Sequence, residues 1–250
     1  MELQLPRFIM DPFTDGKMLT LSEDEAHHAL VVMRLRPGDQ FIAIDGKGSE
    51  YLCNLTEIVE GKAVGEIIRS MRFSNESSVN LTLVMGLPRP AKMDLIVQKV
   101  TELGVRRIVP FLSEYSAFQL DPSELRGKVD RWHRIATEAT KQSLRSIIPK
   151  IANPVKFSDL DVVLSQVDIA VLFTPQGDSE VLGELFKSKI TLPKEVVAIV
   201  GCESGLSPQE EEKLLMLGAR SCKLGPRRLR TETAAIVAIS LILYELGEMV

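Results

Sequence analysis

The first part of the chain alternates apolar and polar positions in short segments that turns separate. Three such segments, QFIAID, EYLCNLTEIV and AVGEII, lie between residues 40 and 68, and a glycine-containing turn follows each of the first two. Alternation bounded by such turns is typical of antiparallel strands. A helical segment, DEAHHALVVMRLRPGD, precedes them and ends in a Pro-Gly-Asp turn. We therefore predict a small β-barrel over residues 1–72.

The pattern changes after the polar segment RFSNESS, which predicts a linker over residues 73–78. Five apolar runs then read as buried strands: VNLTLVMGL, RRIVPFLS, DIAVLFTP, EVVAIVG and RSCKLG. Five segments have helical periodicity: residues 92–103, residues 127–145, SEVLGELFKS, SPQEEEKLLMLG and TETAAIVAISLILYELGE. This alternation predicts an α/β fold over residues 79–250, with a mostly parallel sheet covered by helices on both faces.

Ligands bind such sheets at the carboxyl ends of the strands, where three loops are expected here. These loops cover residues 173–177, 201–205 and 224–227, and they converge if their strands are neighbours. Gly201 and Gly205 would allow the backbone to approach a ligand closely, although a plain strand-to-helix turn would also explain them. Ser207, Pro208 and Glu210 then mark a helix start with a capping box.

Composition excludes several classes of protein. The chain has 250 residues, a net charge of -4, and three cysteines without a C-x-x-C pair. A disulfide framework and a zinc site are therefore not expected, and a reducing cytoplasm is the expected location. The apolar runs are too short to span a membrane, and no signal-peptide pattern is present. Dinucleotide-binding and P-loop glycine motifs are also absent, and the three histidines have no metal-ligand spacing.

Basic charge is concentrated in two places. Residues 220–230 carry five Lys or Arg and no acid, and the predicted helix over residues 127–145 carries a stripe of charge. This stripe consists of Arg131, Arg134, Glu138, Lys141 and Arg145. Such a stripe is often only a solvated helix face, but the second cluster favours a surface for a polyanion. A hydrolase using Ser204 or Cys202 is a weaker alternative, because the sequence places no base beside either residue.

Five segments together resemble the 16S ribosomal RNA uridine N3-methyltransferases of the SPOUT superfamily. They are HHALVVMRLRPGD, KMDLIVQKVTELGVRRIVP, RWHRIATEATKQSLRSIIP, IVGCESGLSPQEEE and LGPRRLRTETAA. The resemblance implies a PUA-like RNA-binding barrel at residues 1–72 and a methyltransferase domain with a trefoil knot at residues 79–250. It also implies S-adenosylmethionine as methyl donor, 16S ribosomal RNA or the small ribosomal subunit as substrate, and a homodimer. No metal or membrane is implied.

The resemblance also assigns roles to residues. The expected cofactor-binding residues are Phe173, Thr174, Gly201, Glu203, Gly205, Leu224, Gly225, Arg227, Leu229 and Thr231. Arg230 and Glu203 are the expected catalytic residues. A cation beside the base would stabilise the uridine anion, which makes Arg230 the first candidate for that role, with Arg227 expected to hold a phosphate instead. The expected RNA-binding residues are Arg7, His28, Arg34, Arg36, Arg131, Arg134, Lys141 and Arg145. Thr231 is expected to cap the final helix, with Glu232 at its positive end.

Two loops depart from the family pattern. The family usually has Gly-Pro-Glu-Gly-Gly where this chain has GCESG at residues 201–205, and commonly an apolar residue where this chain has Arg228. The altered loop leaves a second interpretation open, an RNA-binding or ribosome assembly factor that keeps the fold without the chemistry. Saturable binding of S-adenosylmethionine would separate the two.

Overall fold

The computed structural model describes residues 5–11, 16–71, 75–116, 122–175, 180–187 and 192–249. Contacts divide the chain into two compact units. The first comprises Met1–Glu76 and Thr140–Ile148, and the second comprises Ser77–Ala139 and Pro149–Val250. The chain therefore enters the first unit twice, which the sequence pattern did not predict.

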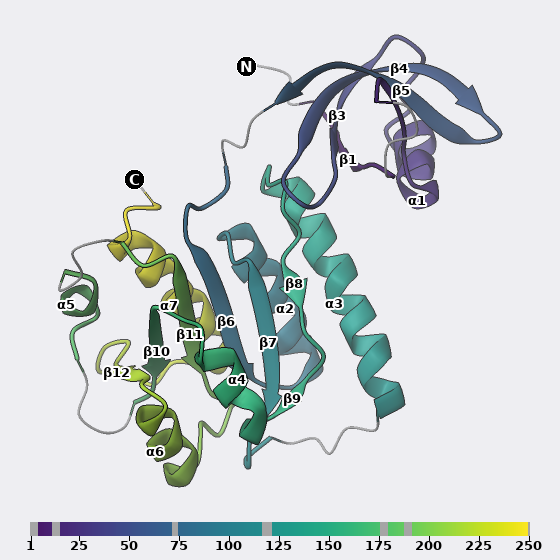
Figure 1. The fold of residues 1–250 in the computed structure, drawn as a ribbon. Helices are drawn as coiled ribbons and strands as arrows, with labels where there is room; N and C mark the ends of the chain where they lie inside the picture. The colour runs from purple at the N-terminus through teal and green to yellow at the C-terminus, as the bar shows by residue number, and fades with distance from the viewer. Residues whose placement is uncertain are drawn as a thin grey trace. The chain divides into compact units, whose positions relative to one another are not determined.

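The first unit contains a five-stranded sheet in the order β1-β3-β4-β5-β2 (Figure 1). Its strands are β1 (Arg7–Ile9), β2 (Met18–Thr20), β3 (Gln40–Ile44), β4 (Glu50–Val59) and β5 (Lys62–Met71). β1 is parallel to β3, and the other pairs are antiparallel. A single antiparallel bridge between Met10 and Leu21, next to the two edge strands, curls the sheet into a half-barrel.

A helical segment and an apolar core complete this unit. Helix α1 (Glu23–His27) continues into one π-helical turn over His28–Val32. Apolar side chains from the strands and the helix form the core: Phe8, Leu19, Leu21, Ala26, Phe41 and Leu55. The rings of Phe8 and Phe41 meet edge to face at 5.8 Å between centroids. The inward positions of the alternating strands thus supply the core that the pattern predicted.

The second unit contains a parallel sheet in the order β12-β10-β11-β6-β7-β8, with β9 also paired to β7. Its strands are β6 (Asn80–Gly86), β7 (Arg107–Leu112), β8 (Lys150–Ile151), β9 (Val155–Lys156), β10 (Ile169–Phe173), β11 (Glu195–Val200) and β12 (Arg220–Cys222). Every pairing in it is parallel. The predicted parallel α/β architecture is confirmed, and β10, β11 and β12 are neighbours.

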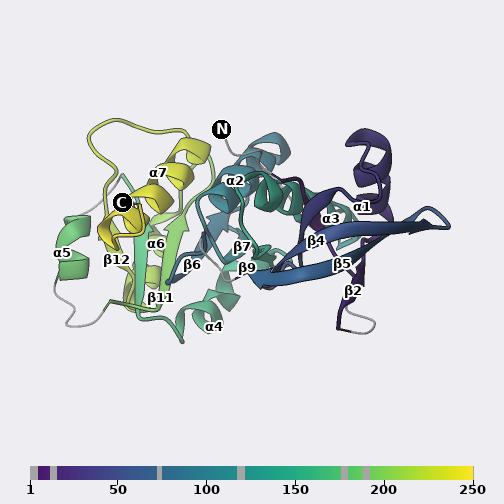
Figure 2. The same cartoon turned by 90° about the horizontal axis from the view of Figure 1, so that it is seen from above.

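Helices cover both faces of this sheet (Figures 1 and 2). They are α2 (Pro90–Glu102), α3 (Pro122–Gln142), α4 (Leu160–Leu164), α5 (Leu182–Lys187), α6 (Pro208–Met216) and α7 (Thr231–Glu245). On one face, Leu160 of α4 and Leu214 of α6 pack with Phe111, Leu172 and Ile199 of the strands. On the other face, α7 lies against β11 and β6 and packs against α2. None of the described helices is long and apolar enough to cross a membrane.

Two helix ends test the local predictions. The capping box of α6 is confirmed, because the Ser207 hydroxyl accepts from the Glu210 N–H while the Glu210 carboxylate accepts from the Ser207 N–H. The end of α3 was predicted three residues too late. Leu144 has a left-handed φ of 59°, a conformation that cannot continue a right-handed helix. Arg145 therefore leaves the helical stripe on which the sequence placed it.

Candidate functional site

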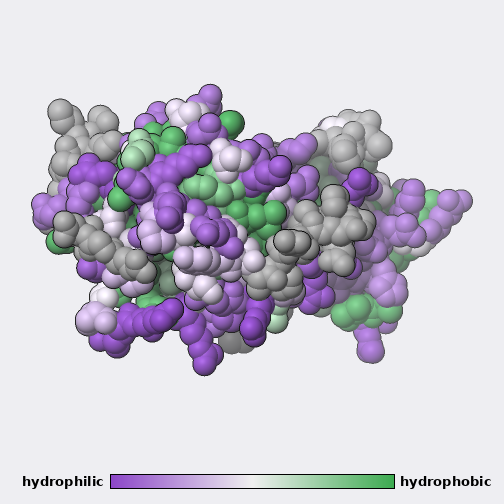
Figure 3. Space-filling view, turned by 90° about the horizontal axis from the view of Figure 1, so that it is seen from below, coloured by the Kyte–Doolittle hydropathy of each residue, from purple (hydrophilic) through white to green (hydrophobic). Residues whose placement is uncertain are grey.

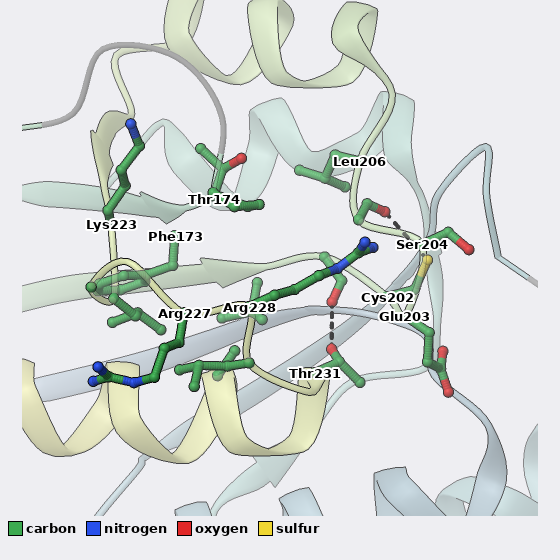
Figure 4. A pocket seen from close by; sticks show the side chains of 18 of the residues that line it. Phe173, Thr174, Cys202, Glu203, Ser204, Leu206, Lys223, Arg227, Arg228 and Thr231 are labelled. Atoms are coloured by element: carbon green, nitrogen blue, oxygen red, sulfur yellow. Dashed lines mark hydrogen bonds between the residues drawn. The ribbon is translucent and has the colours of Figure 1, made fainter.

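The loops after β10, β11 and β12 meet in one pocket because those strands are adjacent (Figure 4). The pocket has a volume of about 540 Å³, within the usual range for small-molecule sites. All ten residues expected at the cofactor site line it: Phe173, Thr174, Gly201, Glu203, Gly205, Leu224, Gly225, Arg227, Leu229 and Thr231. Viewed from the carboxyl ends of the strands, apolar surface lies in the middle of this unit with hydrophilic side chains around it (Figure 3).

The loop after β10 is held by helix α6. Phe173 and Thr174 are buried at the end of the strand, and the Thr174 hydroxyl donates to Glu211 Oε1 at 2.7 Å. Glu211 also lines the pocket, which the sequence reasoning missed. The capping box was a usable indication, because it begins the helix directly after the second loop and brings its first turns beside the pocket.

The loop over residues 201–205 closes on itself. A Cβ on Gly201 would lie 2.9 Å from the carbonyl carbon of Gly205, and Gly205 has a positive φ of 82°. The Cys202 thiol donates to the Gly205 carbonyl at 3.3 Å. Both glycines are therefore required by the turn itself. Within the described residues, the other polar contact of the Cys202 thiol is with the Ser113 hydroxyl, and no base activates the thiol for hydrolysis.

Glu203 is anchored beside the start of helix α2. Its Oε1 accepts from the N–H of Arg89, the residue before α2, at 3.1 Å and lies 3.4 Å from Lys92 Nζ. Burial alone raises the pKa of the Glu203 carboxyl. Hydrogen bonds from the Arg89 and Glu203 N–H groups, together with the charge of Lys92, outweigh burial and lower that pKa below its usual value. Glu203 is therefore a stably ionised carboxylate.

Lys92 joins two elements that the sequence analysis did not connect. Besides Glu203, its Nζ lies 3.4 Å from Glu232 Oε2 in the first turn of α7. Glu232 occupies the helix start as predicted. Lys92 was missed because it follows β6, and only the sheet order shows that β6 lies next to β11.

Thr231 does not cap the final helix, so this prediction is wrong. Arg230 holds the N-cap position with extended backbone angles, and Thr231 is the first helical residue. The Thr231 hydroxyl instead donates to the Gly201 carbonyl at 2.7 Å (Figure 4). Thr231 thereby ties α7 to the loop after β11. A shift of one residue at a helix start cannot be read from the sequence pattern.

The arginines of the last loop point in different directions. Gly225 has a left-handed φ of 88°, which turns the loop after β12. Arg228 extends across the pocket toward Ser204, whereas the Arg227 guanidinium points away from it (Figure 4). Arg230 is exposed and is not among the pocket-lining residues.

Three expected RNA-binding side chains form ion pairs within the first unit; Lys141 and Arg145 are buried, and Arg7 is partly buried. Arg7 pairs with Glu50 at 2.6 Å and Lys141 with Glu25 at 2.6 Å. Arg145 pairs with Glu76 at 2.9 Å, and that carboxylate also accepts from the N–H groups of Ser146 and Ile147. The predicted exposed stripe is therefore wrong at Lys141 and Arg145. Burial of a long basic side chain depends on a distant carboxylate, which helical spacing does not show.

The other expected RNA-binding arginines are exposed. They are Arg34, Arg36, Arg131 and Arg134. Arg131 pairs with Asp94 at 2.9 Å but remains solvent-accessible. His28 is half-buried, and its ring meets the Phe8 ring edge to face at 5.8 Å. Within the part of the chain that the structure describes, no group of acidic, histidine and cysteine side chains could hold a metal ion.

Comparison with known proteins identifies relatives over nearly the whole chain. Residues 75–243 match an RNA methyltransferase domain, and residues 21–68 match an RNA methyltransferase PUA domain. The chain is 33% identical to ribosomal RNA small subunit methyltransferase E of Bacillus subtilis, over 92% of this chain and 91% of that protein. It is 32% identical to the Aquifex aeolicus protein of the same name, over 91% and 95% of the two chains.

A solved structure agrees with these relatives. The Neisseria gonorrhoeae ribosomal RNA small subunit methyltransferase E, bound to S-adenosylmethionine, superposes with a TM-score of 0.83 and 28% identity. The match covers 96% of this chain and 98% of the other.

Proposed function

The chain belongs to the family of ribosomal RNA small subunit methyltransferase E, and from this membership we propose that it methylates 16S ribosomal RNA with S-adenosylmethionine as methyl donor. We propose N3 of one uridine as the acceptor atom, as the resemblance of the sequence motifs implies. The observation that carries the proposal is the pocket in which three loops bring all ten expected cofactor residues together.

The lining of the pocket fits S-adenosylmethionine. Phe173, Leu224 and Leu229 supply apolar surface for a flat adenine ring, and Thr174 and Thr231 are fixed by hydrogen bonds at the rear of the loops. Gly225 turns the loop without a side chain, which leaves its backbone amides and carbonyls accessible to a ligand. S-adenosylmethionine supplies an electrophilic methyl group on a sulfonium.

The residues of the chain must prepare the uridine. Its N3 bears a proton and is a poor nucleophile until that proton passes to solvent, so a cation beside the base would stabilise the anion that forms. We assign this role to Arg230, which is exposed at the N-cap of α7, directly before Thr231 of the pocket lining. Alignment of the reacting atoms is the second contribution of the protein.

Glu203 is better suited to anchoring than to catalysis. A carboxylate with a lowered pKa is a weak base. The Glu203 carboxylate also already accepts a hydrogen bond from the Arg89 N–H and pairs with Lys92. We propose that Glu203 holds the loop after β11 against α2. This replaces the catalytic role that the sequence analysis gave it.

The remaining parts of the molecule have separate roles in the proposal. We assign residues 1–72 to a PUA-like RNA-binding domain, residues 73–78 to a linker and residues 79–250 to the methyltransferase domain, except that Thr140–Ile148 pack with the first unit. Matches at residues 21–68 and 75–243 support this division. The exposed arginines would contact RNA phosphates: Arg34, Arg36, Arg131 and Arg134. We keep His28, which is half-buried, as a further RNA-binding residue. Arg7, Lys141 and Arg145 would support the fold instead.

Three further features follow from the family and remain proposals. We propose that the loops around residues 201–205 and 224–230 form a trefoil knot, which the adjacency of β10, β11 and β12 would permit. We propose a homodimer that uses α7, on which Leu241 and Tyr244 are exposed although the helix is strongly apolar. A bacterial ribosomal RNA substrate would place the enzyme in the cytoplasm.

Mapping of ribosomal RNA tests the function. In 16S ribosomal RNA from cells that lack this protein, mass spectrometry should show the loss of one methyl group on one uridine. Reverse transcription should also cease to stop there, because N3 lies on the base-pairing edge. The wild-type gene should restore both, whereas Gly201→Val should not, since a side chain there collides with Gly205. Unchanged methylation in the deleted strain would refute the proposal.

A further inference from the structure

The pocket contains positive charge that no described residue neutralises. Its basic lining residues are Lys223, Arg227 and Arg228, and its acidic ones are Glu203 and Glu211. Lys92 already pairs with Glu203, and Glu211 accepts from the Thr174 hydroxyl. Among the described residues, no ion pair or hydrogen bond is found for the three cationic side chains. A cation without a protein partner in a concave site is expected to bind an anionic group of the ligand.

Of these cations, only Arg228 reaches across the pocket. Figure 4 shows its side chain running through the middle of the site, with the guanidinium near Ser204. The Lys223 ammonium lies at the opposite end, and the Arg227 guanidinium points away. Arg228 therefore extends from the loop after β12 toward the loop after β11, and a ligand between these loops would lie beside its guanidinium.

We propose that Arg228 binds the carboxylate of the methionyl group of S-adenosylmethionine and thereby selects the intact cofactor. That carboxylate is the one anionic group of the molecule, whose ammonium and sulfonium are cationic. The planar guanidinium fork matches a carboxylate through two parallel hydrogen bonds. The inference rests on the proposed function, because it takes S-adenosylmethionine to be the ligand of this pocket.

An RNA phosphate would also match a guanidinium. The position of Arg228 favours the cofactor, because its guanidinium lies over the pocket between two cofactor loops. A phosphate contact would be expected from a side chain that points away from the pocket, as Arg227 does.

Titration calorimetry on the full-length protein tests the inference with two probes, S-adenosylmethionine and its decarboxylated form, which lacks only the carboxylate. Wild type should bind the intact compound about tenfold more tightly, the scale of one charge-assisted contact. Arg228→Leu should abolish this preference without lowering the affinity for the decarboxylated probe. Arg228→Lys, which keeps the charge without the fork, should retain part of it. Arg107→Leu is the matched control, because Arg107 is exposed at the opposite end of the strands.

Two results would overturn the inference: equal binding of both probes by wild type, or an unchanged preference in Arg228→Leu. An unchanged preference together with a loss of 16S RNA affinity in that variant would assign Arg228 to an RNA phosphate instead. If Arg228→Leu bound neither probe, the Arg228→Lys variant would supply the test. Equal binding of the two probes by Arg228→Lys would then contradict the carboxylate contact. Failure of wild type to bind S-adenosylmethionine, its decarboxylated form and methylthioadenosine would instead refute the proposed function.

Discussion

Arg230 stands at the border between the pocket and the surface. It is the N-cap residue of α7, exposed to solvent, and its neighbour Thr231 lines the pocket. A purely structural role would require a carboxylate partner, either Glu232, the nearest one in the sequence, or a carboxylate of a second copy of the chain. In the structure Glu232 lies 3.4 Å from Lys92 instead. The geometry therefore leaves Arg230 available to a substrate.

Arg230→Lys tests the catalytic role. Methyl transfer should slow by about 10- to 1000-fold, the scale of one lost oriented electrostatic contact, because lysine keeps the charge but not the planar fork. Affinity for S-adenosylmethionine and the melting temperature should change little. Single-turnover methylation with saturating RNA, run beside calorimetry and thermal melts, measures all three. An unchanged rate, or a fall in melting temperature that accounts for the loss, would contradict the assignment; Arg107→Lys is the control.

At the scale of elements, Lys92 links helix α2, helix α7 and the loop after β11. One ammonium lies 3.4 Å from a carboxylate oxygen of both Glu203 and Glu232. The folded-state pKa of Glu203 is lowered from 4.5, so this carboxylate contributes stability above about pH 4.5 that is lost as the pH falls through its folded pKa. Lys92 is one cause of that lowering.

When the pH is lowered, the Lys92→Met variant should therefore lose stability at a higher pH than wild type does. Without the ammonium, the folded-state pKa of Glu203 rises, because burial raises it and only the hydrogen bonds from the Arg89 and Glu203 N–H groups still lower it. Melting temperatures measured from neutral pH down to about pH 3 should fall earlier in the variant than in wild type. Lys99→Met is the matched control on the same helix, since Lys99 pairs with Glu102 on the surface. Superimposable pH profiles for Lys92→Met and wild type would disprove the link.

The ion pair between Lys141 and Glu25 joins two distant segments of the first unit. Their side chains are 5% and 9% exposed, and the Nζ–Oε1 distance is 2.6 Å. Lys141→Met should lower the free energy of unfolding by about 3–5 kcal/mol, because it leaves a buried carboxylate without its counter-ion. Adding Glu25→Leu should recover most of that loss. Urea denaturation followed by circular dichroism compares the variants, and a double variant no more stable than the single one would contradict the argument.

At the scale of the whole molecule, the exposed apolar residues of helix α7 support the proposed homodimer. It is apolar through most of its length, packs on β11 and β6, and still exposes Leu241 and Tyr244 at 38% and 62%. An apolar helix that its own unit covers only in part is expected to pack against a second copy.

Sedimentation across a concentration series tests this assembly. Wild type should remain dimeric at sub-micromolar concentration, and Tyr244→Glu should shift the equilibrium toward monomer by placing a charge in an apolar interface. Met216→Glu, at an exposed apolar position of α6, should leave the dimer intact. A stable wild-type monomer would remove the dimer from the proposal. If Tyr244→Glu and Met216→Glu changed the monomer–dimer equilibrium equally, the dimer interface could not be assigned to α7.

Local pattern determined most of the second unit. Apolar runs become β6, β7, β10 and β11, and the capping box begins α6 at Pro208, because burial and helix capping depend on residues close in sequence. The three loops at the strand ends followed from the same pattern. Strands of two or three residues, such as β1, β2, β8 and β9, have too few positions to show a period.

Tertiary structure alone decided the partners of charged side chains. The sequence could place Lys141 and Arg145 near one helix face, but Glu25 and Glu76, more than sixty residues away, bury them. It could find Glu203 in a loop, but only the adjacency of β6 and β11 brings Lys92 to it. The energy of an ion pair depends on distance and burial in space. Separation along the chain determines neither, so the sequence predicted where the site forms but not which of its charges are already paired.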